Sequence, residues 1–302
     1  MENRIKLFTH TDLDGIGCGI LAKYIYKGNV DIEYCNYDDV NTKVGEFLLG
    51  SSKHEYENIF ITDISVNEEV ANIIEREIKY KTVLLDHHPT ALWLNKYSWA
   101  RVEEFDEKLK EKTSGTWMLY NYLDKYNCYV ETFSDNVRKY DTWQWKRDND
   151  LFPKKLNDLF HIYGRDLFIE KALYYLESKA YFIIGKQEEL LLKLKQDEIN
   201  KYIESKNNNI IEKDILGYKA GVVFAEMFTS ELGSRLSEMN PNLDFIAMIN
   251  LDYSISYRSI KDNVNLSEVA KHFKGGGHPK ASGSPIPKDI KDLIVDICFK
   301  GE

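Results

Sequence analysis

The sequence predicts an α/β protein with a parallel-sheet N-terminal domain, flanking helices, a helical connector and a smaller α/β C-terminal domain. Over the first ~160 residues, short apolar runs alternate with stretches whose apolar residues recur at helical spacing, as in strands joined by crossover helices. Between residues 163 and 207, helical periods continue among dense charge without proline. Beyond them, strand-like and helix-like runs alternate again. We therefore expect domains at 1–162 and 211–302, joined by a helical linker at 163–210.

The expected elements of the first domain follow one another in strand–helix order. Apolar runs predict strands at 5–8, 30–34, 59–62 and 81–85. Helical periodicity predicts helices at 16–26, 41–49, 67–79, 114–126 and 131–140, and Ser114-Gly115-Thr116 is typical of a helix cap. In the second domain the same reasoning predicts strands at 220–225, 245–251 and 254–259, with helices near 230–239 and 266–273. The triplet Asn207-Asn208-Asn209 marks the turn before them.

Composition limits the classes of function. The 49 acidic residues outnumber the 40 basic residues, giving a net charge of −9, so an extended electrostatic grip on long duplex DNA is not expected. The four cysteines lie far apart without a CxxC pair, which favours a reducing cytosol over a disulfide scaffold. No apolar stretch reaches membrane-spanning length, and the N-terminus enters a strand without a signal-peptide core. We expect a soluble, cytoplasmic protein.

Acids and histidines gather where the N-terminal strands are expected to end. His10-Thr11-Asp12-Leu13-Asp14 follows the first strand, Asp63 follows the third, Asp86-His87-His88 follows the fourth, and Asp141 follows a helix. The carboxyl ends of parallel strands meet at one edge of a sheet. Carboxylates converging there would repel one another unless divalent cations lay between them. The pattern therefore predicts a two-metal site.

Each motif also has an ordinary structural explanation. Asp12 and Asp14 suit a turn and a helix cap, and Asp63 suits a strand-end cap. The two histidines of Asp86-His87-His88 suit a turn, and Asp141 suits the cap of a helix beginning near Trp143. All four explanations must hold together to remove the metal site, so one metal cluster is favoured.

These motifs together resemble the DHH phosphoesterase family, which is named for a triplet such as Asp86-His87-His88. Lys274-Gly275-Gly276-Gly277-His278-Pro279, with Tyr257-Arg258-Ser259 upstream, resembles the family's DHH-associated C-terminal domain. Within the family, the residues Asp12 to Gly19 are most similar to the opening motif of nanoRNase B type oligoribonucleases. The resemblance implies a catalytic, metal-binding domain at 1–162 and a substrate-binding domain at 211–302.

The resemblance also divides the ligands between two ions. The implied ligands of one ion are His10, Asp12 and Asp63, and those of the other are Asp14, Asp63, His87 and Asp141. Mixed nitrogen and oxygen ligands favour Mn²⁺, with Mg²⁺ or Co²⁺ left open as substitutes. Two such ions about 3.5 to 4 Å apart activate a water for in-line attack on phosphorus. Among catalytic residues, Asp86 would orient a ligand and His88 would donate to the scissile phosphate.

The glycine run implies a second grip on the substrate. Between residues 269 and 288 no acidic residue occurs, whereas lysines and histidines do. A flexible surface loop with solvated lysines is the alternative for a three-glycine run taken alone. With the resemblance, Arg258, Gly275, Gly276, Gly277 and His278 are expected to bind a terminal phosphate or base. Trp143 and Trp145 follow the predicted ligand Asp141. Aromatic residues in such a place more often form a wall of the hydrophobic core than a surface that stacks on a nucleic-acid base.

The combined pattern predicts a manganese-dependent phosphodiesterase that hydrolyses short RNA oligonucleotides to mononucleotides. Linear or cyclic dinucleotides, 3′-phosphoadenosine 5′-phosphate and short single-stranded DNA remain alternative substrates. A nucleotide-binding regulator with a relict site is a second class, disfavoured because every predicted ligand is present. The expected partners are short oligoribonucleotides or dinucleotides, without long duplex DNA or a membrane. The sequence leaves open whether the chain forms a homodimer.

Overall fold

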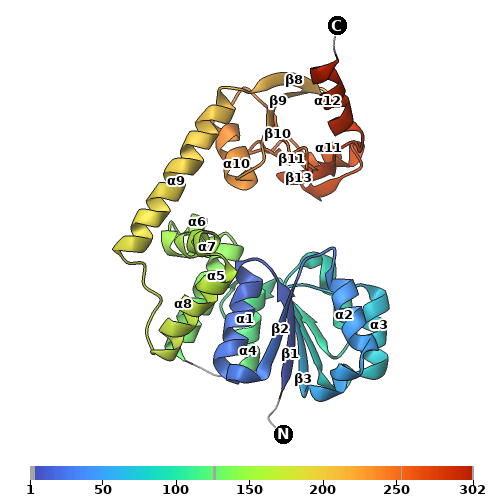
Figure 1. Cartoon of the computed structure of the whole chain (residues 1–302), viewed down its shortest axis with the longest axis vertical. Helices are drawn as coiled ribbons and strands as arrows, with labels where there is room; N and C mark the ends of the chain where they lie inside the picture. The colour runs from blue at the N-terminus through green and yellow to red at the C-terminus, as the bar shows by residue number, and fades with distance from the viewer. Residues whose placement is uncertain (1–3, 125–126, 253, 301–302) are drawn as a thin grey trace. The chain divides into compact units, whose positions relative to one another are not determined.

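The structure is a computed structural model that describes residues 4–124, 127–252 and 254–300. The chain divides into an N-terminal unit, residues 1–192, and a C-terminal unit, residues 193–302 (Figure 1). Helix α9 (Lys186–Asn207) crosses the boundary between them. Helix α8 (Arg165–Glu177), which falls in the range expected to link the domains, packs in the core of the N-terminal unit.

The N-terminal unit is built on a five-stranded parallel sheet. Its order is β2 (Val30–Cys35), β1 (Ile5–His10), β3 (Asn58–Thr62), β4 (Thr82–Asp86) and β5 (Ala100–Val102). All neighbouring strands in it pair in parallel, which confirms the predicted fold class. The sequence predicted the first four of these strands, whereas β5 contributes only three residues, too few for a periodic pattern.

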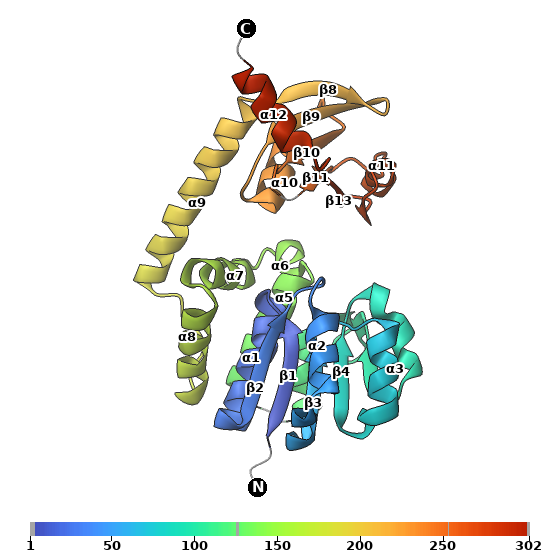
Figure 2. The same ribbon diagram turned by 45° about the vertical axis from the view of Figure 1, so that its right-hand side comes forward.

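Helices cover both faces of this sheet (Figure 2). Helices α2 (Val40–Leu49) and α3 (Glu68–Glu77) lie on one face. On the other face, α1 (Leu13–Tyr26), α4 (Gly115–Leu123), α5 (Cys128–Asp141) and α7 (Leu151–Tyr163) bury a second core. Successive residues of β1 serve the two cores, since Leu7 packs in one and Phe8 in the other. Smaller elements are β6 (Phe105–Asp106), β7 (Glu111–Lys112) and α6 (Gln144–Arg147).

The C-terminal unit, the shorter of the two, is a six-stranded sheet with helices on both faces. Its order is β12 (Gly276–His278), β13 (Ala281–Pro285), β11 (Ser254–Arg258), β10 (Phe245–Ile249), β9 (Tyr218–Phe224) and β8 (Ile211–Ile215). Only β9 and β10 pair in parallel. Helix α10 (Thr229–Met239) packs in one core and α11 (Leu266–His272) in the other, while α12 (Ile290–Phe299) has no buried residue. The predicted α/β C-terminal domain is confirmed.

Among the described residues, no helix is long and apolar enough to cross a membrane.

Candidate metal centre

Three adjacent strands deliver the candidate ligands to one edge of the N-terminal sheet. β1 ends at His10, β3 ends one residue before Asp63, and β4 ends at Asp86. Because β1, β3 and β4 are parallel neighbours, their carboxyl ends lie side by side. Asp141 comes from elsewhere, as the last residue of α5. We use the name histidine–aspartate cluster for His10, Asp12, Asp14, Asp63, His87 and Asp141.

One part of the cluster consists of His10, Asp12 and Asp63, whose ligand atoms lie within 4.8 Å of one another. His10 Nδ1 is 2.9 Å from Asp12 Oδ2 and 3.8 Å from Asp63 Oδ2. Neither contact is a hydrogen bond, so His10 Nδ1 and Asp63 Oδ2 are buried without a hydrogen-bond partner. Buried polar atoms rarely lack a hydrogen-bond partner. A cation bound between His10 Nδ1 and Asp63 Oδ2 would provide a partner for both atoms.

The other part consists of Asp14, His87 and Asp141, whose ligand atoms also lie within 4.8 Å of one another. His87 Nε2 lies 3.4 Å from Asp141 Oδ2 and 3.7 Å from Asp14 Oδ2. It also lies 3.2 Å from Asp63 Oδ1. Asp63 therefore turns one carboxylate oxygen toward His10 and the other toward His87, which is the arrangement of a ligand shared by two cation sites.

The charges of the cluster are unbalanced without a cation. Burial, and then the negative charges of Asp14 and Asp12, raise the pKa of both Asp63 and Asp141 well above the usual range. Burial also lowers the pKa of His87, despite the opposing effect of Asp14. Among the ion pairs of the described residues, these aspartates pair only with histidines. Imidazole and carboxylate donors without a lysine or arginine fit a divalent metal.

Helix α4 holds Asp14 in place. The backbone N–H of Gly115 donates to Asp14 Oδ2 at 2.6 Å, and that of Thr116 donates to Oδ1 at 2.9 Å. A carboxylate at a helix N-terminus accepts such bonds favourably. The predicted cap is confirmed, since Ser114 Oγ accepts from the N–H of Trp117. Its support of Asp14 is a finding that sequence reasoning missed, because Gly115 is 101 residues away in the chain.

Glycines bring the segments of the cluster close together. A Cβ on Gly115 would lie 2.5 Å from the Cβ of Asp63, and a Cβ on Gly15 would overlap the backbone of His10. Asp63 itself adopts the left-handed conformation, with φ of 57°. A non-glycine residue in this conformation is uncommon and is often retained at functional sites.

Asp86 and His88 form a hydrogen-bonded pair beside the cluster. Asp86 is buried, its Oδ1 lies 2.7 Å from His88 Nδ1, and its Oδ2 accepts from Ser65 Oγ. Burial tends to lower the pKa of His88, but the hydrogen bond and charge of Asp86 outweigh it, so the pKa is raised. The Tyr37 hydroxyl lies 3.2 Å from His88 Nε2. Asp86 thus fixes the orientation of His88.

Tyr37 is a site residue that sequence reasoning missed. Its side chain is 61% exposed, and its ring centroid lies 4.8 Å from that of His10. Tyr37 follows the end of β2 by two residues. The prediction relied on strand ends followed by acids of the predicted cluster, and β2 is followed by none of them. Considering the carboxyl end of every strand would have identified Tyr37.

The candidate substrate residues lie in the C-terminal unit. Arg258 pairs with Ala281 and Ala281 pairs with His278 across antiparallel strands, so the three side chains share one face of the sheet. Gly276 and Gly283 form the next pair on this face. The region between Arg258 and His278 therefore carries only a methyl group and glycines. Burial lowers the pKa of Arg258. Its guanidinium donates to the Tyr257 carbonyl, and no ion pair among the described residues includes it.

The three glycines have different structural roles. A Cβ on Gly277 would lie 2.6 Å from the Cα of Ser282, and φ at Gly277 is 136°. A Cβ on Gly275 would overlap the backbone at Gly283. Gly276 has no atom within 4 Å of the Cβ position. Packing of β12 on β13 thus explains Gly275 and Gly277, and only Gly276 faces open space.

The chain is similar throughout its length to proteins that cleave phosphodiesters. It is 37% identical over 304 residues to oligoribonuclease NrnB of Bacillus subtilis, which covers 97% of this chain and 76% of the relative. The chain belongs to the DHH phosphoesterase family. It is a hydrolase of this family. No protein-family model matches the sequence. A more distant relative, 24% identical over 354 residues, is a 3′,5′-cyclic-nucleotide phosphodiesterase of Helicobacter pylori, with 96% of this chain and 97% of the relative covered.

Solved structures share the DHH fold. A DHH domain described as a member of the S1p family of ribosomal proteins has a TM-score of 0.58 at 14% identity, covering 98% of this chain and 86% of that one. RecJ of Thermus thermophilus, solved in complex with Mn²⁺, has a TM-score of 0.53 at 13% identity, covering 97% of this chain and 51% of RecJ. At these identities the likeness establishes the fold alone.

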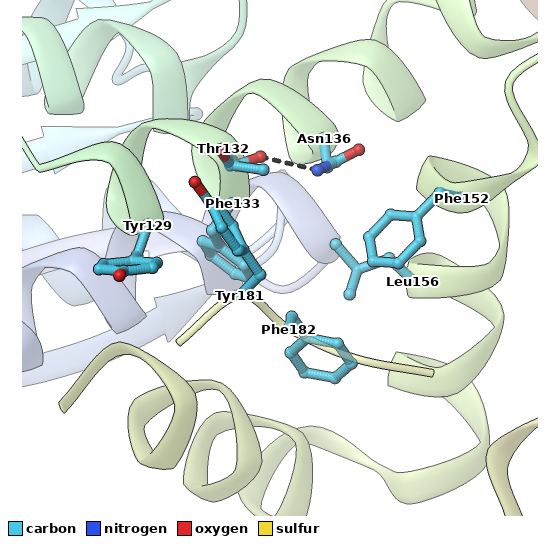
Figure 3. Close-up of a pocket in the computed structure, with 8 residues that line it drawn as sticks. All are labelled: Tyr129, Thr132, Phe133, Asn136, Phe152, Leu156, Tyr181 and Phe182. Atoms are coloured by element: carbon cyan, nitrogen blue, oxygen red, sulfur yellow. Dashed lines mark hydrogen bonds between the residues drawn. The ribbon is translucent and has the colours of Figure 1, made fainter. Parts of the chain in front are cut away.

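A pocket away from the cluster lacks groups for this chemistry. It measures about 240 Å³ and lies beside α5 and α7 (Figure 3). Its lining residues are mostly aromatic or apolar: Tyr129, Thr132, Phe133, Asn136, Phe152, Leu156, Tyr181 and Phe182. Asn136 Nδ2 donates to the Thr132 carbonyl at 2.7 Å. Because no acid, histidine or basic residue lines it, this pocket does not provide metal or phosphate ligands for the DHH reaction.

Proposed function

We propose that this DHH hydrolase is a manganese-dependent phosphodiesterase that cleaves short RNA oligonucleotides to mononucleotides with two bound ions. The observation that carries the proposal is the placement of Asp63, with one oxygen toward His10 and the other toward His87. The name of the Bacillus subtilis relative, an oligoribonuclease, supports the substrate class.

The cluster supplies the proposed ligands of both ions. One ion would be held by His10, Asp12 and Asp63, and the other by Asp14, Asp63, His87 and Asp141. Bound there, the ions would lower the pKa of a water nucleophile and stabilise charge on the phosphate oxygens. Imidazole nitrogen together with carboxylate oxygen favours manganese over calcium, and no described cysteine is among the grouped donors. The choice of manganese is supported by RecJ of Thermus thermophilus, which shares this fold and was solved in complex with Mn²⁺.

The protein's own catalytic groups would be His88 and Asp86. The Nδ1 atom of His88 is occupied by Asp86. The other ring nitrogen, Nε2, contacts the Tyr37 hydroxyl in this structure. We propose that Nε2 donates a hydrogen bond to the scissile phosphate when substrate is bound. Asp86 acts through His88 and does not contact the substrate.

We propose that residues 211–302 form a substrate-binding domain. The bare strip between Arg258 and His278 suits a nucleotide, because it lets a flat base or phosphate approach the backbone, and Arg258 offers a cation that no described carboxylate neutralises. Arg258→Ala or His278→Ala should raise KM while the metals stay bound. Loss of manganese in either variant would contradict a separate substrate-binding role.

A cyclic nucleotide is the second candidate substrate, favoured by the name of the Helicobacter pylori relative. A turnover panel separates the candidates: RNA dimers to pentamers, matched DNA, cyclic and linear dinucleotides, 3′,5′-cyclic mononucleotides and 3′-phosphoadenosine 5′-phosphate. We expect the highest kcat/KM for short RNA in manganese. Binding without cleavage of any substrate would support a nucleotide-binding regulator instead. The cytoplasm is the proposed location, supported by four described cysteines that are all free thiols.

A further inference from the structure

Stacked aromatic rings follow the candidate ligand Asp141 directly. Trp143 is 60% exposed, and its ring lies against that of Trp145 with centroids 6.0 Å apart and planes 29° from parallel. Tyr140 stacks on Trp145 in turn, at 6.4 Å and 14°. We use the name tryptophan platform for Trp143 and Trp145. The platform is not the core wall expected from the sequence, because neither tryptophan is buried.

The backbone holds the platform in a fixed conformation. The N–H of Thr142 donates to the Arg138 carbonyl at 2.9 Å, and the N–H of Trp143 donates to the Tyr140 carbonyl at 3.1 Å. The buried guanidinium of Arg138 donates to Gln144 Oε1 at 2.8 Å. Trp143 itself has a φ of 61°, in the left-handed region that a bulky residue rarely adopts. Trp143 thus combines an exposed side chain with a strained backbone conformation, although it contributes little to the hydrophobic core. Such strain is often retained at functional sites.

A cation accompanies the exposed ring. Lys146 Nζ lies 5.9 Å from the Trp143 ring centroid. The adjacent basic residue Arg147 is neutralised by ion pairs with Glu111 and Asp148. No ion pair within the described residues involves Lys146, so its charge is available for an anion. A flat aromatic surface beside a cation is how proteins bind a base of a single-stranded nucleic acid and its phosphate.

We propose that the tryptophan platform is a base-binding subsite, in which Trp143 stacks on the base of the nucleotide next to the scissile phosphate and Lys146 binds a neighbouring phosphate. The proposal rests on the proposed function and refines it. Consecutive Cα atoms are 3.8 Å apart, so those of Asp141 and Trp143 are separated by no more than about 7.6 Å. The platform is therefore about one nucleotide from the cluster that would hold the scissile phosphate.

The test compares Trp143→Ala and Trp143→Phe with the wild type on an RNA dinucleotide and on its two abasic analogues, each lacking one base. We expect Trp143→Ala to raise KM about tenfold with little change in kcat, as loss of one stacked base implies. Trp143→Phe should recover most of the affinity. On the abasic analogue that lacks the stacked base, wild type and Trp143→Ala should have equal KM. Lys146→Gln should weaken binding more at low salt than at high salt.

Tyr80→Ala is the matched control, because Tyr80 is 78% exposed and precedes β4, at the opposite end of the strand from Asp86. It should change neither KM nor kcat. An unchanged KM in Trp143→Ala, or the same increase on both abasic analogues, would overturn the platform. Titration with a non-hydrolysable dinucleotide, followed by tryptophan fluorescence, tests the platform independently of the enzyme proposal. Absence of RNA cleavage by the wild type refutes the enzyme proposal. Equal Kd values for wild type and Trp143→Ala refute the platform.

Discussion

At the scale of single residues, Asp63 carries more of the proposed chemistry than any other side chain. It is 1% exposed, its oxygens face different histidines, and its φ of 57° costs about 1–3 kcal/mol in a non-glycine residue. The position next to a strand end is visible in the sequence. The strain and the division of its two oxygens are not, because they arise only when β1, β4 and α4 close around it.

Asp63→Asn keeps the size of the side chain but removes the charge that both ions would share. We expect kcat/KM to fall at least about a hundredfold, since losing even an outer partner of a ligand costs 10–100-fold. In the presence of a chelator the variant should be no less stable than wild type, because the substitution removes a repelling charge. Turnover and thermal unfolding measure the two effects. Near wild-type turnover would contradict the assignment.

The raised pKa values of Asp63 and Asp141 give a prediction for the metal-free protein. Because the folded-state pKa values of these two carboxyls lie above the unfolded values, the folded protein binds more protons than the unfolded chain. The free energy of unfolding therefore decreases as pH rises from the unfolded pKa through the folded one. Burial opposes ionisation of Asp12, but the close contact with His10 and the hydrogen bond from the Gly15 N–H bring its pKa to about 2, so its contribution is constant at neutral pH.

We therefore expect Tm in a chelator to fall as pH rises above the unfolded aspartate pKa of about 3.9, and added Mn²⁺ to raise Tm most at the upper end of the pH range. Thermal unfolding across this range is the measurement. A Tm in chelator that rises with pH would contradict the unbalanced charge of the cluster.

At the scale of elements, two short segments position the site. The N-terminus of α4 binds both oxygens of Asp14 and packs against Asp63. In the C-terminal unit, β12 and β13 pair closely enough that two of three consecutive glycines are required by packing. The sequence predicted the first as a helix cap and the second as a substrate loop. It did not predict that the glycine run is a strand, because three residues without side chains carry no alternation.

Gly115→Ala should displace Asp63, since the new Cβ would lie 2.5 Å from the Cβ of that residue. We expect metal affinity and turnover to fall together, with a loss of stability of about 1–3 kcal/mol from overpacking. Gly45→Ala is the matched control: it lies in α2 with nothing within 4 Å of its Cβ position. That change should stabilise the protein by about 0.5–1 kcal/mol and leave turnover unchanged. Equal behaviour of the two variants would remove the proposed role of Gly115.

Gly276→Ala and Gly277→Ala separate substrate binding from packing within one strand. The methyl group at 276 meets no atom, so it should leave Tm near the wild-type value and raise KM if a nucleotide lies against the strip. The methyl group at 277 would lie 2.6 Å from Ser282 Cα at a φ of 136°, so it should lower Tm. Unchanged KM in Gly276→Ala would indicate that the substrate does not approach this strand.

At the scale of the whole molecule, periodicity predicted four of the five strands of the N-terminal sheet but only three of the six strands of the C-terminal sheet. The motifs at the expected strand ends, together with Asp141, predicted the residues of the histidine–aspartate cluster. Helix α3 was predictable because its buried residues, Val70, Ala71 and Ile74, recur at helical spacing. The hairpin of β6 and β7, two residues in each strand, was not. Contacts between distant segments, such as Gly115 with Asp14 or Tyr37 with His88, depend on tertiary packing that no local pattern records.

The most direct measurement is hydrolysis of labelled RNA dimers to pentamers by the purified chain, in Mn²⁺, in chelator, and with Asp63→Asn beside the wild type. We predict that wild type with Mn²⁺ converts these oligomers to mononucleotides, and that chelator or Asp63→Asn abolishes conversion. RNA that wild type binds in Mn²⁺ but leaves intact, or cleavage that persists in Asp63→Asn, would contradict the assignment of the cluster as the catalytic metal centre.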